Sequence, residues 1–381
     1  MNLYKTSGIK NTRIDVADAL RGIAVAGIIL YHSVEHFNMY SPALNMPYTL
    51  ACDGKVADIM AWLLSGKMYG IFAMLFGLSF FIQNDNQQQR GNNFSGRFLW
   101  RMCLLFVLGI LNTAFYDGDI LLSYAVYSLI LIPLSYLPSV YSWILFGLLI
   151  IQPVEIYSVL SGWRPDMSGM GAAYKAMGVA HHGGTFFDNA AANLRYGQYA
   201  TYLWCLYKGR HTQTVALFIL GMLFGRMRLF YNEGNNLKIW RNILLVCLPL
   251  TIIGAVFGLQ EIKNWGRVLY PIFNFFLLMT IVSTVVLLWY RFEGFQKALS
   301  SMRTFGKMSL TNYFLQSIIG STLFCYYGFN LSAKIGITYA VMVGILMVVC
   351  QYAFCVWWFK KHDHGPLESL WKKLTWIKFK A

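Results

Sequence analysis

An arginine and a histidine stand at the two ends of one apolar run near the start of the chain. Ten mainly apolar residues separate Arg21 from His32. In a helix, eleven steps of about 1.5 Å place them roughly 16 Å apart along the axis, a little over half of a hydrocarbon core about 30 Å thick. Because an ionisable side chain is costly at that depth, we interpret His32 as a functional residue. The alternative is a structural histidine that hydrogen-bonds to a neighbouring helix.

The chemistry that His32 offers is proton transfer. A neutral imidazole removes a proton from a hydroxyl or amine and can later return one to a leaving group. Glu35 and His36 follow at three and four residues and share its helix face, and Asp58 stands at the start of the next apolar segment. A carboxylate of Glu35 or Asp58 on the far ring nitrogen would fix the tautomer and stabilise the imidazolium. These three residues could equally form a polar cap at the membrane surface.

Two further polar groups interrupt apolar segments. Asp117 and Asp119 bracket a glycine in a short turn with no lysine or arginine nearby in the sequence, so they could bind a polar acceptor or a cation. Asp119 could instead cap the helix that begins there. Asn312 and Gln316 lie four residues apart on one helix face, where they would contact a donor molecule or hydrogen-bond across helices.

The elements that position these residues must be membrane-spanning helices. The 381 residues are 57% hydrophobic and only 12% charged, about half the charged fraction of a soluble domain. The long runs are continuously apolar rather than alternating, which favours helices over a barrel. We therefore predict one all-α, polytopic integral membrane domain over residues 1–381. Its ten expected segments are about 20–38, 57–82, 98–116, 119–137, 140–160, 213–229, 239–258, 268–290, 309–328 and 335–359.

The distribution of basic residues predicts the orientation of these helices. With both termini inside, 21 of the 31 Lys and Arg residues fall on the cytoplasmic side, and half of the other ten lie in the long loop 161–212. This asymmetry predicts an N-in, C-in topology, with Arg21 at the cytoplasmic side and His32 toward the outer half. The first segment lacks a small-residue cleavage site, so we expect it to stay in the protein.

Two segments depart from short connections between spanning helices. The extracytoplasmic loop 161–212 is predicted to form one or two amphipathic helices that partly roof the bundle, or a simple interfacial anchor. The cytoplasmic tail 360–381 mixes Trp with Lys, which is typical of the headgroup region.

The net charge of +15 does not predict nucleic-acid binding, because the basic residues gather at helix ends. Membrane lipids are the expected partners. Seven cysteines without metal-type spacing predict neither a metal site nor a disulfide. The small residues between Gly70 and Gly77 fit a homodimer interface and intramolecular packing equally well.

Several motifs resemble known membrane proteins. The first helix of bacterial acyltransferase-3-type enzymes is similar to the stretch Asp18-Ala-Leu-Arg-Gly22. The resemblance includes the histidine that follows the arginine after ten intervening residues. Later stretches resemble the related YeiB-like (DUF418-type) family, and together they run nearly the whole chain. Many YeiB-like sequences carry Asn in place of His32, so the catalytic interpretation depends on the histidine kept here. The stretches are 66–77, 118–124, 306–317 and 364–371.

The resemblance implies a transmembrane acyltransferase of the bacterial cytoplasmic (inner) membrane. Cytoplasmic acyl-coenzyme A, which we expect to be acetyl-coenzyme A, would be the co-substrate, and the acceptor would be an extracytoplasmic or lipid-linked sugar. His32 would be the general base, oriented by Glu35 or Asp58, and cations at the inner mouth would meet the phosphates of the donor. The residues expected to bind the donor are Arg21, Arg97, Arg101, Asn312 and Gln316, and those expected to bind the acceptor are Asp117, Asp119 and His36.

Two other classes of protein fit the same residues. A transporter or flippase for a lipid or small metabolite would use buried His and Asp as a proton relay. A non-catalytic member of the fold would serve as a partner subunit in envelope assembly.

The topology is tested by cysteine labelling in a background without the native cysteines. A membrane-impermeant thiol probe should reach a cysteine at Asn92 only from the cytoplasm and one at Gly183 only from outside. The reverse pattern at either position would contradict the N-in, C-in arrangement.

Overall fold

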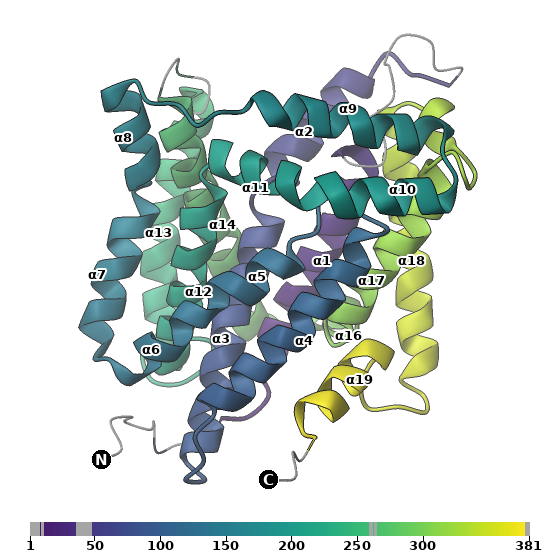
Figure 1. The fold of residues 1–381 in the computed structure, drawn as a ribbon. Coiled ribbons are helices and arrows are strands. Elements are labelled where there is room, and N and C mark those ends of the chain that lie inside the picture. The colour runs from purple at the N-terminus through teal and green to yellow at the C-terminus, as the bar shows by residue number, and fades with distance from the viewer. Residues whose placement is uncertain (1–7, 9–10, 36–47, 259–261, 263–264, 378–381) are drawn as a thin grey trace.

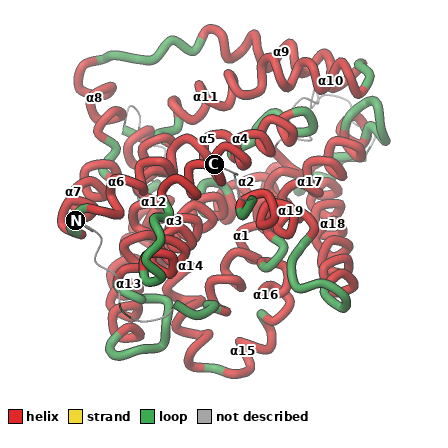
Figure 2. The backbone as a smooth tube through the Cα atoms, turned by 60° about the horizontal axis from the view of Figure 1, so that its bottom comes forward, coloured by secondary structure: helices red, strands yellow, loops and turns green. Residues whose placement is uncertain are grey.

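The computed structural model describes residues 8, 11–35, 48–258, 262 and 265–377 (Figure 1). Within this part of the chain every regular element is a helix, and the sole bridge of strand type joins Tyr48 to Ile335 (Figure 2). Seven stretches are long and apolar enough to cross a membrane. The prediction of an all-α polytopic membrane protein is confirmed, while ten spans and the orientation stay predictions. The seven stretches are α1 (Asp15–Glu35), α2 with α3 (Asp53–Leu64 and Met68–Gln88), α4 (Ser95–Thr113), α7 with α8 (Ser139–Ile150 and Pro153–Ser161), α13 (Asn236–Val256), α14 (Gly266–Arg291) and α18 (Ile337–Trp358).

The other three predicted segments are shorter helices that run among the long ones. Two of them, α12 (Arg210–Arg226) and α17 (Ser309–Phe324), are single helices, and the third, over 119–137, is divided into α5 (Leu121–Tyr127), η1 (Ser128–Ile130) and α6 (Leu131–Tyr136). Every residue of α12 from 216 to 225 is buried. A helix that is apolar on all sides is expected at the centre of a bundle.

Two of the predicted spans are interrupted. The segment predicted over 57–82 breaks between α2 and α3 at residues 65–67, where Gly66 has a φ of 81°. The segment predicted over 140–160 breaks at Gln152, which has a φ of 63°. A positive φ ends a helix and is adopted most readily by glycine. Both breaks lie at the end of the bundle that faces the loop 161–212.

The burial of the long helices separates an inner from a peripheral set. In α1, 72% of the most apolar stretch is buried, whereas the value is 17% for α7 with α8 and 22% for α13. The outward face of α13 exposes Leu245, Val246, Ile252 and Ile253. Apolar side chains on the perimeter fit a lipid environment, so α1 with its histidine is an interior helix of the bundle.

Glycines bring the central helices into backbone contact. A Cβ atom at Gly77 of α3 would lie 2.0 Å from the carbonyl oxygen of Phe218, and one at Gly221 of α12 would lie 1.8 Å from that of Met74. Gly70 faces side chains of α12 and α14. Small residues allow such close packing of membrane helices. The glycines at 70 and 77 are therefore used for packing within the chain.

Short helices cover the two ends of the bundle. One end is crossed by the helices of the loop 161–212, and the other carries the short helices near the C-terminus (Figure 1). The first set comprises α9 (Ser168–Gly183), α10 (Phe186–Ala192), η2 (Asn193–Gly197) and α11 (Gln198–Tyr207). The second set comprises α15 (Glu293–Ala298), α16 (Ser300–Gly306) and α19 (Pro366–Thr375), and η4 (Leu331–Ala333) lies between α17 and α18. We call the end with α9–α11 the outer end and the end with α19 the inner end.

The α3–α12 contact predicts a large effect of a single methyl group. Gly221→Ala should lower the free energy of unfolding by about 1 to 3 kcal/mol, because the new Cβ overlaps a backbone oxygen that cannot rotate away. Thermal unfolding of the purified protein measures the loss. Gly147→Ala on α7 is the control, since nothing lies within 4 Å of a Cβ there. Equal midpoints for the two variants would contradict the close α3–α12 crossing.

Candidate functional site

Three cavities follow one another through the bundle beside α1. The inner pocket has a volume of about 750 Å³, a small chamber beside His32 has about 100 Å³, and the outer pocket has about 1510 Å³. The chamber shares Tyr124 with the inner pocket. It shares five lining residues with the outer pocket, namely Tyr31, Glu35, Ser65, Trp204 and Arg210. The chamber therefore lies between the two pockets.

His32 is held in this chamber by side chains from distant parts of the chain. Its Nδ1 lies 3.1 Å from Oε1 of Gln316 on α17. When Nδ1–H donates to this amide oxygen, Nε2 carries the lone pair that a base requires. The ring centroid lies 4.5 Å from that of Tyr116 and 6.5 Å from that of Tyr313. The contact with the amide oxygen fits the tautomer that carries its proton on Nδ1, and the two aromatic rings restrict the orientation of the imidazole.

The carboxylates predicted to orient His32 occupy different places. Glu35 is half-buried and lines both the chamber and the outer pocket, so it lies close to the histidine. Asp58 is exposed and lines the outer pocket alone. His36 lies outside the described residues. The contact of Gln316 with Nδ1 was not anticipated, because we placed Gln316 on the donor side, although a glutamine in an apolar helix was the available signal.

Asp119 is fully buried behind the histidine. Its Oδ1 accepts hydrogen bonds from Asn112 Nδ2 at 2.8 Å and from the Tyr313 hydroxyl at 3.3 Å, while its Oδ2 accepts one from the backbone N–H of Leu121 at 3.0 Å. The last bond satisfies a free backbone N–H group at the start of α5, but the N-cap residue of that helix is Ile120 rather than Asp119. Because Asp119 also holds Tyr313 beside His32, it supports the site from a second layer.

The backbone of Asp117 connects the turn at residues 117–119 to the helices at the outer end. Its backbone oxygen accepts a hydrogen bond from the Thr201 hydroxyl at 3.1 Å, and a Cβ at Gly197 would lie 3.0 Å from the Asp117 backbone. The aspartate is buried, and like Asp119 it is not among the described residues that line the three cavities. The turn therefore connects α11 to the histidine chamber.

Two of the arginines predicted to bind a donor line the inner pocket. Arg21 donates to Asp18 Oδ1 at 2.5 Å and to the Ser79 hydroxyl at 2.7 Å, and Arg13 holds the other oxygen of Asp18 at 2.6 Å. Arg101 lies 4.1 Å above the ring of Trp371. Both arginines border the cavity. Sequence reasoning missed the other basic residues in this lining, which are Arg13, Lys307, His364 and Lys372.

The remaining residues predicted at the donor end make structural contacts. Arg97 donates to the backbone oxygens of Thr375 at 2.8 Å and Ile377 at 2.9 Å, so it anchors the end of α19 and does not line the inner pocket. Asn312 is buried and donates to the backbone oxygen of Phe305 at 3.1 Å. Of the five predicted donor-binding residues, the structure brings Arg21 and Arg101 together at one cavity.

Helix α19 forms one wall of the inner pocket. Glu368 accepts hydrogen bonds from the backbone N–H groups of Leu310 at 2.8 Å and Thr311 at 3.0 Å at the start of α17. Burial raises the pKa of this carboxyl group, although these hydrogen bonds favour its charged form. The tail is thus docked onto the bundle, and its Trp371 and Lys372 face the cavity.

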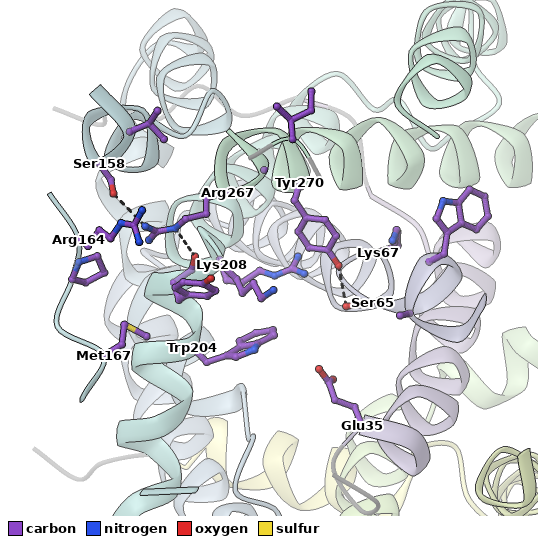
Figure 3. A pocket seen from close by; sticks show the side chains of 18 of the residues that line it. Glu35, Ser65, Lys67, Ser158, Arg164, Met167, Trp204, Lys208, Arg267 and Tyr270 are labelled. Atoms are coloured by element: carbon purple, nitrogen blue, oxygen red, sulfur yellow. Dashed lines mark hydrogen bonds between the residues drawn. The ribbon is translucent and has the colours of Figure 1, made fainter. Parts of the chain in front are cut away.

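The outer pocket is lined by more positive than negative side chains. Arg164, Lys208 and Arg267 gather on one side, and Glu35 points in from the other (Figure 3). Lys67 at the α2–α3 break and Arg210 at the start of α12 also line it. None of these cations was selected from the sequence, although a lysine inside an apolar segment was a visible signal.

Comparisons with known proteins find a matching family model and several similar chains. A family model described as a protein of unknown function, DUF418, matches residues 224–378. YxaH of Bacillus subtilis (strain 168) is 25% identical, with 97% of this chain and 96% of that protein aligned. YeiB of Escherichia coli (strain K12) is 28% identical, with 94% and 95% aligned. A 39.9 kDa protein from the amylase 3' region of Bacillus acidopullulyticus is 23% identical, with 96% and 94% aligned.

The three relatives carry the description uncharacterized. Their similarity over nearly the whole chain and the DUF418 match support the expected YeiB-like, DUF418-type relationship. The resemblance to acyltransferase-3-type enzymes stays an expectation.

Proposed function

We propose that this protein is a membrane-embedded acyltransferase of the bacterial cytoplasmic membrane. It transfers a short acyl group from acyl-coenzyme A in the inner pocket to a polar acceptor in the outer pocket, with His32 as the general base. The observation that carries this proposal is the position of the histidine chamber, which shares lining residues with a basic pocket at each end. Two substrates from opposite sides of the membrane would meet at His32.

The inner pocket suits the phosphates of coenzyme A. Among the described residues, its lining includes five cationic side chains and two carboxylates, Asp18 and Glu368. The cationic residues are Arg13, Arg21, Arg101, Lys307 and Lys372. Guanidinium groups bind phosphate oxygens through charge-assisted hydrogen bonds. The rise of roughly 16 Å along α1 from Arg21 to His32 is comparable to the length of an extended pantetheine arm.

The small chamber favours a short acyl group. Its volume is about 100 Å³, and the ring of Tyr124 lies between it and the inner pocket. The Tyr124 hydroxyl donates to the backbone oxygen of Tyr69 at 2.8 Å, and its ring packs against Phe72 and Phe76. A thin thioester arm would pass such a constriction, so acetyl-coenzyme A is the donor we propose.

The reaction at His32 is a single acyl exchange. Nε2 of His32 removes the proton of the acceptor hydroxyl as the oxygen attacks the thioester carbonyl. The carbon–sulfur bond breaks, the imidazolium returns the proton to the sulfur, and the products are an ester and free coenzyme A. Gln316 supports this sequence by holding Nδ1–H, since this contact keeps Nε2 as the basic nitrogen.

A transporter is the second candidate function. Its support is the pair of pockets at opposite ends of the bundle that meet at a narrow chamber, together with the broken α2–α3 helix, a feature common at transporter binding sites. In that case His32 would relay protons. Acyl transfer by purified protein separates the two, because a transporter has no turnover of acetyl-coenzyme A.

Arg21→Ala should weaken coenzyme A binding by about tenfold or more, which corresponds to about 1.4 kcal/mol. The loss is expected because the guanidinium group would contact a phosphate. Isothermal titration of the purified variant measures the affinity. The control is Arg291→Ala, an exposed arginine that does not line the inner pocket. Unchanged affinity in a folded Arg21 variant would remove this residue from the donor site.

His32→Ala should reduce acetyl transfer by about 10²-fold or more while leaving donor binding intact, because a positioned base contributes that much. A purely structural histidine would behave differently, with a loss of about 1 to 3 kcal/mol of stability and activity reduced only in proportion to folded protein. His32→Asn is the sharper variant, since Asn can still hydrogen-bond Gln316 but cannot take a proton near neutral pH. Full turnover by the Asn variant would eliminate general-base chemistry at His32.

A further inference from the structure

We propose that the outer pocket contains a binding site for a phosphate group, formed by Lys67 and Arg210 beside the α2–α3 break and completed by the basic residues at the pocket rim. The group would belong to a soluble phosphate ester or to a phospholipid headgroup. As an identification of the acceptor, the inference rests on the proposed acyl transfer. As an anion site, it is independent of that reaction and depends on the contacts of Lys67 and Arg210.

The break at Gly66 brings two polar side chains against the backbone. A Cβ atom at this position would lie 2.6 Å from Nη1 of Arg210 and 2.6 Å from Nδ2 of Asn274. Glycine is therefore required both for the φ of 81° and for the approach of the guanidinium group. Arg210 at the start of α12 and Asn274 on α14 therefore meet at the break, directly beside Lys67 in the sequence.

Lys67 supplies a buried amine that has no carboxylate partner among the described residues. Its side chain is fully buried, and its Nζ has no hydrogen-bond partner in the described chain. The faces of Tyr270 and Phe273 lie near this amine, with ring centroids 5.9 Å from Nζ. An unpaired buried cation is costly. The lysine lines the outer pocket, so an anion in that pocket would supply the missing partner.

Arg210 adds a second buried cation that lacks a carboxylate partner among the described residues. It is 2% exposed, and Nη1 donates to the Tyr69 hydroxyl and to Oε1 of Gln213, both at 3.0 Å. Its Nε has no partner in the described chain. Neutral partners hold the guanidinium group in place without cancelling its charge, which leaves it able to bind an anion.

Asn274 presents further hydrogen-bonding capacity at the same point. It is fully buried, and neither Nδ2 nor Oδ1 has a partner within the described residues. Buried amides are normally hydrogen-bonded. Asn274 does not itself line the outer pocket, whereas Lys67 and Arg210 do. Its Nδ2 would be a further donor to an anion that reaches Gly66 from that pocket.

The rim of the pocket favours a group with more than one negative charge. Arg164, Lys208 and Arg267 add three cations, against Glu35 and Asp58 among the lining residues (Figure 3). Nη1 of Arg267 donates a hydrogen bond to the Ser158 hydroxyl oxygen at 3.3 Å. Clustered cations in a cleft concentrate the field and attract multiply charged ligands. Five cations around one cavity fit a phosphate better than a single carboxylate.

The test compares anion binding by the wild type and Lys67→Met after detergent washing has removed lipid. Glycerol 3-phosphate should raise the thermal midpoint of the wild type, whereas glycerol or succinate at matched ionic strength should not. Lys67→Met keeps the length of the side chain, so it should fold, melt higher without ligand and bind glycerol 3-phosphate at least tenfold more weakly. Lys175→Met on α9 is the control, since Lys175 is exposed and does not line the pocket.

Native mass spectrometry separates the two sources of the phosphate. Phosphatidylglycerol retained by the wild type but lost from Lys67→Met would identify a lipid headgroup. Protection by glycerol 3-phosphate without retained lipid would identify a soluble ester. The proposal is overturned when the wild type binds neither, when succinate protects as well as the phosphate, or when Lys67→Met binds like the wild type.

A rim variant covers the case in which Lys67→Met does not fold. Arg267→Gln should weaken glycerol 3-phosphate binding at least threefold, and an unchanged affinity would overturn the proposal. His32→Asn distinguishes this inference from the proposed function, because it should bind the phosphate normally while losing acyl transfer. Phosphate binding by a wild type without transfer activity would reject the acyltransferase and keep the anion site.

Discussion

The close contact of α3 with α12 is the constraint on which the rest of the bundle depends. Gly77 and Gly221 bring the two backbones together. The two helices run parallel, as shown by the hydrogen bond from Tyr69 near the start of α3 to Gln213 near the start of α12. This pairing places Arg210 at the point where the chain breaks before α3. In a bilayer the freed backbone and the buried charges can be satisfied only by neighbouring protein or by a ligand. The packing of two apolar helices thus determines where the polar cavities open.

The histidine chamber depends on a second set of contacts, which spans most of the sequence. Gln316 reaches His32 across 284 residues, and Tyr313 on the same helix joins Asp119. Asp119 in turn accepts hydrogen bonds from the first backbone N–H group of α5 and from Asn112 on α4. The imidazole is therefore positioned by α17, which is itself tied to the tail through Glu368. The proposed general base would need such support, since small displacements of a catalytic group are costly.

Local pattern and composition predicted the helical class and the Arg21–His32 spacing, because both are encoded in consecutive residues. The same reasoning did not find Lys67 and Arg210 as a pair, since each looks like an isolated charge at a membrane boundary. It also assigned Arg97 to a ligand, whereas the structure shows this arginine on the backbone of the tail. Hydropathy measures the length of an apolar run and is insensitive to a break such as that at Gly66. Contacts between residues far apart in the chain depend on how the helices pack, and a single sequence does not specify that packing.

The parallel arrangement of α3 and α12 has a consequence for the order in which the protein is assembled. Tyr69 and Gln213 are 144 residues apart, so α4 to α11 must be synthesised before α3 meets its partner. During that interval the glycine face of α3 and the amine of Lys67 are in the membrane without the neighbours described above. Parallel contacts at long sequence separation form slowly and leave such surfaces open to incorrect pairing. Completion of this fold is therefore a late event, which follows the insertion of α12.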